Sequence, residues 1–226
     1  MFESDIKSAT HGIYDAHNIG TAVHDEPDSL FIRSKALIGA EGVDRFRKLR
    51  VAVFGIGGVG GYTVEALARA GVGTLYLVDG DTISPSNLNR QLYALTSTIG
   101  QYKTAAAAAR IADTNPACTV HQIVQHILPD ADGTLSFLPF LSDIDCIVDA
   151  VDTISLKVAL AAEAENRGIP IIAAMGCGNK LRADLFQFAD IYDTAVCPLC
   201  KTIRGLLKKR GVKKLRVLYS KEVPAI

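Results

Sequence analysis

Glycines, carboxylates and basic residues that suit nucleotide chemistry cluster between residues 51 and 103. The cluster opens with the apolar run VAVF and a glycine turn, in which Gly55, Gly57 and Gly60 match the pattern G-x-G-x-x-G. Glycines allow a tight turn and a close approach of phosphate to backbone N–H groups, and the N-terminus of a following helix favours negative charge. The turn, which includes Gly58, therefore predicts a nucleotide phosphate site, with a purely structural turn as the alternative.

Two acidic residues follow the glycine turn at the end of the next apolar run. Asp79 lies about 20 residues beyond the turn, where dinucleotide-binding folds place a carboxylate that accepts hydrogen bonds from ribose hydroxyls. Asp81 follows in the same segment, LVDGDT. We expect both to bind the nucleotide, although Asp79 in a cap or turn is the alternative. On the glycine pattern alone, an NAD-dependent oxidoreductase is also compatible.

A second polar cluster follows in the loop after Asp79 and contains Asn87, Asn89, Arg90 and Gln91, with Lys103 at the start of a predicted helix. An arginine and a lysine that converge on a nucleotide suggest neutralisation of a triphosphate while pyrophosphate is displaced. Taken residue by residue, the alternative is a polar loop with Asn in turns and a surface lysine.

A further pair of carboxylates, Asp149 and Asp152, lies at the end of another predicted strand, in VDAVDT (148–153). Open α/β sheets bind their ligands at the carboxyl ends of strands. A carboxylate there could hold Mg²⁺ against phosphates. The spacing fits equally well with Asp152 capping the following helix.

The elements that must position these residues alternate between strands and helices. This order predicts a Rossmann-like, doubly wound α/β fold, with a mostly parallel sheet and helices on both faces. We expect a loop or mobile segment over 1–28, a single ATP-binding domain over 29–226, and a less regular C-terminal lobe after Gly176. Strands are predicted at 50–54, 74–78, 119–124, 146–151, 170–174 and 185–189, and helices at 30–49, 61–70, 103–114 and 155–167.

The composition is that of an ordinary globular protein. The 226 residues are 49% hydrophobic, carry a formal net charge of +0 and include five scattered cysteines. There is neither a run of about 18 apolar residues that could span a membrane nor a secretory signal. We therefore expect a cytoplasmic protein without a disulfide framework or membrane partner.

Cys197 and Cys200 form a single C-x-x-C pair. A structural zinc site of four thiolates needs a second such pair, and none follows. The sequence therefore does not favour zinc. Cys177, in MGCGNK after a predicted strand, could approach the active site, but a small buried thiol is the commoner case.

The segment Lys201–Arg216 contains eight basic residues and no acidic one. One interpretation is a solvated helix face with cations near its C-terminus, where the helix dipole favours them. The other is a basic patch that contacts nucleic acid.

In order and spacing, these motifs resemble those of the ubiquitin-activating-enzyme-like adenylyltransferases of the ThiF/MoeB type. The resemblance rests on GIGGVG (55–60), DGDTISPSNLNRQ (79–91), Lys103 and VDAVDT (148–153). It implies that Asp79 binds the ribose of ATP, that Arg90 and Lys103 contact its phosphates and that Asn87 lines the same pocket. It also implies that Asp152 holds Mg²⁺ and that the protein is a homodimer in which Arg33, in FIRSKALIG, enters the partner's ATP site.

Within this superfamily, three segments are similar to the tRNA threonylcarbamoyladenosine dehydratase family: FIRSKALIGAEGV, ARAGVGTLYLVDGD and CPLCKTIRGLLKKRGVKKLRVLYSKEVP. Members of that family usually continue for a further strand or helix. The resemblance implies ATP-dependent cyclisation of threonylcarbamoyladenosine at position 37 of tRNA through an adenylated carboxylate. It raises the weight of the tRNA interpretation of Lys201–Arg216 and leaves open a cysteine desulfurase partner. The alternatives are adenylation of a ubiquitin-like sulfur carrier's C-terminal glycine and a non-catalytic nucleotide-binding scaffold.

Overall fold

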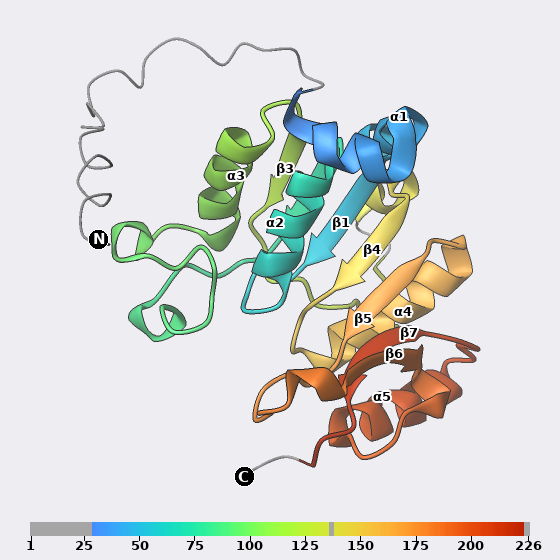
Figure 1. Cartoon of the computed structure of the whole chain (residues 1–226). Helices are drawn as coiled ribbons and strands as arrows, with labels where there is room; N and C mark the ends of the chain where they lie inside the picture. Colours follow the sequence, from blue (N-terminus) through green and yellow to red (C-terminus); the bar gives the residue numbers. More distant parts are fainter. Residues whose placement is uncertain (1–28, 136–137, 224–226) are drawn as a thin grey trace, which may run out of the picture.

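Seven strands form one sheet in the order β3-β2-β1-β4-β5-β7-β6 (Figure 1). The computed structural model describes residues 29–135 and 138–223, so the prediction for 1–28 lies outside the described residues. Neighbouring strands are parallel except β6, which is antiparallel to β7. The predicted doubly wound, mostly parallel sheet is therefore confirmed. The strands are β1 (Arg50–Phe54), β2 (Thr74–Val78), β3 (Thr119–Ile123), β4 (Cys146–Asp149), β5 (Ile171–Ala174), β6 (Phe186–Asp190) and β7 (Arg216–Ser220).

Helices cover both faces of this sheet, as predicted. Along β1, Val51 and Val53 pack in one hydrophobic core with α2 and α3, whereas Ala52 and Phe54 pack in another with α4. Successive residues of a strand point to opposite faces, so an apolar run such as VAVF suits a strand buried on both sides. The helices are α1 (Ile32–Lys48), α2 (Gly60–Ala70), α3 (Lys103–Thr114), α4 (Ile154–Arg167) and α5 (Pro198–Lys209).

The segment after Gly176 is more regular than the predicted lobe, because α5 and β7 both belong to the main fold. Helix α5 packs Ile203 and Leu207 against α4 in a third core, which also contains Val217 and Tyr219 of β7. Strand β7 lies between β5 and the edge strand β6 and joins β6 to the rest of the sheet. In α5 the buried Ile203 and Leu207 are interspersed with basic residues, and β7 begins at the last residue of the basic segment, so neither element was predicted.

The connections bring the chemistry-bearing loops to one edge of the sheet. Since β1, β2, β4 and β5 are parallel neighbours, their carboxyl ends meet there, and the segments that follow them lie close together. This is the edge at which open α/β sheets bind ligands. Among the described residues, no helix has the length and apolar character needed to cross a membrane.

Candidate functional site

A cavity of about 980 Å³ opens at the carboxyl ends of the parallel strands. Its volume is at the upper end of the roughly 300–1,000 Å³ typical of small-molecule sites. Most of the residues predicted for the site line it: Gly55, Gly57, Gly58, Asp79, Asp81, Asn87, Arg90, Lys103 and Asp152. Two predicted residues, Gly60 and Arg33, do not.

The glycine turn joins β1 to α2, and its glycines serve different purposes. Gly55 has a left-handed backbone, with φ of 85°, and an added Cβ would lie 2.8 Å from the Ala150 carbonyl oxygen. At Gly60, an added Cβ would overlap the carbonyl oxygen of Gly55. Gly60 therefore permits close packing of α2 on the turn rather than contact with a ligand, whereas Gly57 and Gly58 line the cavity.

We expect Gly60→Ala to destabilise the fold, because its methyl group would meet a backbone atom that side-chain rotation cannot move. Overpacking of this kind costs about 1–3 kcal/mol. Chemical denaturation would measure the loss, with Gly205→Ala as the matched control. Gly205 lies in α5 with open space around its Cβ position, so alanine there should maintain or raise stability. Equal midpoints for Gly60→Ala and wild type would contradict the packing role.

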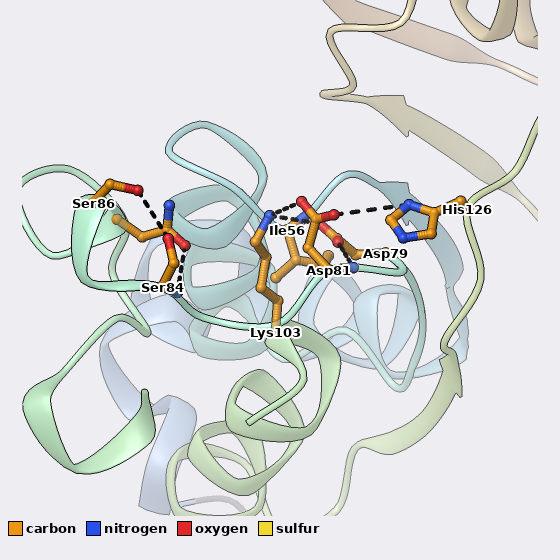
Figure 2. Close-up of polar contacts among 8 residues, drawn as sticks. Ile56, Asp79, Asp81, Ser84, Ser86, Lys103 and His126 are labelled. Atoms are coloured by element: carbon orange, nitrogen blue, oxygen red, sulfur yellow. Dashed lines mark hydrogen bonds and ion pairs between the residues drawn. The ribbon is translucent and has the colours of Figure 1, made fainter. Parts of the chain in front are cut away.

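Lys103 and the two acids after β2 form a compact charged cluster at the cavity (Figure 2). The Lys103 Nζ lies 2.5 Å from an Asp81 oxygen and 3.6 Å from Asp79 Oδ2. Asp79 also accepts hydrogen bonds from the backbone N–H of Ile56 at 2.7 Å and of Asp81 at 2.8 Å. Asp79 is thus fixed against the glycine turn, and its carboxylate has further lone pairs for ribose hydroxyls.

The loop between Ser84 and Gln91 is organised by its own polar groups. The Asn87 side-chain oxygen accepts from the Ser84 N–H at 3.0 Å, so the turn interpretation holds for this oxygen although Asn87 also lines the cavity. Arg90 donates to the Ser86 carbonyl at 2.7 Å and to Asn89 at 3.1 Å. Arg90 is exposed and also lines the cavity, so its guanidinium can exchange these contacts for an anion.

Asp152 lies on the turn between β4 and α4 and lines the cavity. The interpretation of Asp152 as a helix cap is wrong, because Thr153 occupies the N-cap position and no side chain caps α4. Within the described ranges, we find no hydrogen bond or ion pair of the exposed Asp152 carboxylate. Mg²⁺ is commonly held by one or two carboxylates together with substrate phosphates, and Asp152 suits that role. The described residues contain no group of three or more His, Cys, Asp or Glu side chains that could hold a metal ion alone.

A buried ion pair below this turn was not predicted as part of the site. Lys157 of α4 donates to both Asp149 oxygens at 3.0 Å and to the Ala174 carbonyl at 2.8 Å. Both side chains are 1% exposed. Burial raises the pKa of the Asp149 carboxyl, and the Lys157 ammonium opposes that rise. The pair links the end of β4 to the end of β5. Asp149 ends β4 and Lys157 lies in α4, the next helix. The contact depends on how α4 packs over β4, which the sequence spacing alone does not indicate.

Cys177, Cys197 and Cys200 are free thiols. Cys197 and Cys200 are buried at the start of α5, and burial together with the neighbouring Cys197 raises the pKa of Cys200 to about 12. Cys177 lines the cavity, and burial also raises its pKa. A raised pKa disfavours the reactive thiolate, so neither Cys177 nor Cys200 has the environment of an activated nucleophile.

The chain is similar to known proteins in sequence and in structure. The model of the ThiF family matches residues 32–216. The tRNA threonylcarbamoyladenosine dehydratase of Bacillus subtilis (strain 168) is 43% identical over 197 residues, which cover 87% of this chain and 76% of that protein. The protein of the same name from Haemophilus influenzae is 38% identical over 165 residues. These residues cover 73% of this chain and 62% of the Haemophilus influenzae protein. The crystal structure of the Escherichia coli tRNA N6-threonylcarbamoyladenosine dehydratase in complex with ATP superposes with a TM-score of 0.82 at 29% identity, covering 90% of this chain and 86% of that one. The chain belongs to the ThiF family.

Proposed function

We propose that this protein is an ATP-dependent tRNA threonylcarbamoyladenosine dehydratase that forms an adenylate. The observation that carries the proposal is the pairing of Lys103 with Asp79 and Asp81 at the cavity, beside the glycine turn. A cation and a carboxylate together beside a glycine turn suit the phosphates and the ribose of a nucleotide. The similarity to two proteins named as this dehydratase supports the same activity.

The proposed reaction has two steps. A carboxylate oxygen of the threonyl group attacks the α-phosphorus of ATP and displaces pyrophosphate. A nitrogen of the adjacent carbamoyl unit then attacks the adenylated carbonyl carbon, so that AMP leaves, a proton is released and a ring closes. Net loss of water results, and no protein nucleophile is needed because the attacking nitrogen belongs to the substrate. This agrees with the raised pKa of the Cys177 thiol, which lines the cavity.

The proposed roles of the site residues follow from where they lie. Asp79 holds the ribose, while Arg90 and Lys103 neutralise the phosphates. Asp152 would hold Mg²⁺, which would supply further neutralisation of the leaving pyrophosphate. Asn87, whose oxygen braces its own loop, fixes the position of that wall of the nucleotide site.

The direct test is mass analysis of tRNA nucleosides after incubation with ATP and the protein. The expected product is threonylcarbamoyladenosine lighter by the mass of one water, with AMP and pyrophosphate formed only when modified tRNA is present. A protein that exchanges pyrophosphate into ATP with a sulfur-carrier protein and no tRNA would be a carrier-activating enzyme instead. ATP binding without AMP release on any tRNA would indicate a scaffold.

The basic residues of Lys201–Arg216 differ in their contacts, and two of them, Lys208 and Arg216, lie over the rings of Tyr192 and Phe188. Arg204 donates to backbone carbonyls at Ile191 and Thr194, and Arg210 donates to that of Gly133, so these arginines support the fold. Lys201, Lys209, Lys213 and Lys214 have exposed side chains, and no contact of their ammonium groups is found among the described residues. We propose that these four lysines contact the tRNA backbone.

We expect replacement of Lys209, Lys213 and Lys214 by alanine to weaken tRNA binding and its salt dependence together. Each phosphate contact contributes roughly 0.7–0.9 to the slope of log K against log salt, so loss of three should reduce that slope by about 2. Filter binding or fluorescence anisotropy across a salt series would measure it. Lys48→Ala, at the end of α1, is the control. An unchanged slope would remove the tRNA assignment of this surface.

Arg33 lies on the exposed surface of α1, outside the cavity lining. It therefore does not contribute to the site of its own chain in this arrangement. Ile32 and Leu37 beside it are 66% and 85% exposed, and an apolar surface of this kind suits contact with another subunit. These observations support the proposal of a homodimer in which Arg33 acts in the partner's site.

A further inference from the structure

The cavity extends beyond the region that the nucleotide motifs account for. One side is formed by the glycine turn, the acids after β2 and the Arg90 loop. The other side is formed by Ala174–Gly178, at and after the end of β5, with Leu199 from the first turn of α5. With the ribose assigned to Asp79 and the phosphates to Arg90 and Lys103, the β5 side lies beyond the residues assigned to the nucleotide.

Two glycines on the β5 side have no backbone reason to be glycine. Neither Gly176 nor Gly178 has φ in the left-handed region, and an added Cβ at either position would meet no atom within 4 Å. Gly55 and Gly60 differ, since backbone atoms block a Cβ at both. Gly176 and Gly178 nevertheless line the cavity. The fold therefore does not require glycine at either position, and each position has room for a larger side chain beside the cavity.

This side of the cavity is held in place by contacts from β7 and α4 and by one contact within the segment itself. Met175 donates its N–H to the Leu218 carbonyl of β7 at 2.9 Å. The Ala174 carbonyl accepts the buried Lys157 ammonium. The Cys177 thiol donates to the Met175 carbonyl at 3.2 Å. These contacts hold the backbone of Ala174, Met175 and Cys177, which flank Gly176.

We propose that Ala174–Gly178 and Leu199 form the wall that receives the modified nucleoside of tRNA, and that Gly176 and Gly178 set the size of group admitted. The inference rests on the proposed function. A carboxylate that displaces pyrophosphate approaches the α-phosphorus opposite the leaving group, so the acyl substrate needs room that the residues assigned to the nucleotide do not line, and the β5 side of the cavity supplies it. The wall has no charged side chain, which suits a nucleobase and its neutral linkages. Helix α5 continues from this wall to the exposed Lys201, on the surface assigned to the tRNA backbone.

Substitution of the glycines by residues of increasing size tests the wall. We expect Gly176→Ala and Gly178→Ala to raise the KM for tRNA, and the leucine variants to lower kcat/KM for tRNA by on the order of tenfold to 100-fold, the range seen when pocket size is mismatched. The Kd for ATP, measured calorimetrically on the same variants, should stay at its wild-type value. Ala109→Leu is the control, since Ala109 is exposed on α3, outside the cavity lining and away from the lysines assigned to tRNA.

The outcomes separate the wall from the proposed function. Wild-type protein that forms no AMP with modified tRNA contradicts the function and, with it, the substrate assigned to the wall. Active wild-type protein whose glycine variants keep the wild-type KM and kcat/KM for tRNA contradicts the wall alone. A rise in the Kd for ATP as large as the effect on tRNA would assign these glycines to the nucleotide instead. Thermal unfolding of each variant identifies any effect that comes from loss of the fold.

Discussion

Arg90→Ala is expected to lower the turnover of tRNA-dependent AMP formation by about 100- to 1,000-fold, the cost of removing one positioned charge from a site of this kind. Arg90 lines the cavity, and among the described residues its guanidinium bonds only to its own loop, at Ser86 and Asn89. A triphosphate therefore offers it a better partner than the loop does. Its contribution to stability is small, because a solvent-exposed hydrogen bond contributes little.

Separate measurements distinguish loss of chemistry from loss of fold. Thermal unfolding of Arg90→Ala should match wild type, while kcat falls. Arg90→Lys keeps the charge without the planar fork and should recover part of the rate. Lys103→Ala is a less clean probe, because it leaves Asp79 and Asp81 close together without their shared cation. Near-wild-type turnover of Arg90→Ala would contradict the proposed catalytic role of Arg90.

The strands and the nucleotide side of the cavity were predictable because they depend on local patterns. An apolar run before a glycine turn fixes a strand and the helix that follows it, and the strand order then places Asp79 and Asp152 at one edge. The six predicted strands all form, with ends that differ by at most about two residues, as expected where elements fray. Asp152 shows the limit of such patterns, since spacing alone gave a helix cap and a metal ligand equal support.

The features that were not predicted depend on contacts between distant segments. Gly60 matches the motif, but only the approach of the Gly55 carbonyl shows that it serves packing. Strand β7 completes the sheet beside β5, although its sequence reads as the end of a basic run. Gly176 and Gly178 gain significance from the open space around them, which no motif encodes. Lys157 likewise acquires its role only when α4 folds back over β4.

Lys157→Met is expected to destabilise the protein by about 3–5 kcal/mol, the cost of leaving one member of a buried ion pair without its partner. Asp149 would keep its hydrogen bond from the Val151 N–H at 3.2 Å but lose both contacts from the ammonium. The Ala174 carbonyl would lose its Lys157 donor as well. Urea denaturation would measure the loss. The double variant Asp149→Asn with Lys157→Met removes both charges and should recover part of the stability.

The pH dependence of Lys157→Met identifies the unpaired carboxylate as the cause. Burial raises the pKa of Asp149, and the variant lacks the Lys157 charge that opposes the rise. Its folded state therefore binds a proton at pH values where the unfolded state, with a carboxyl pKa of about 3.9, has released it. Relative to wild type, the stability of the variant should fall as pH rises from about 4 through the raised pKa, and should recover as pH is lowered. A deficit that is constant across this pH range would instead indicate that only packing was lost, and the double variant would then show no recovery.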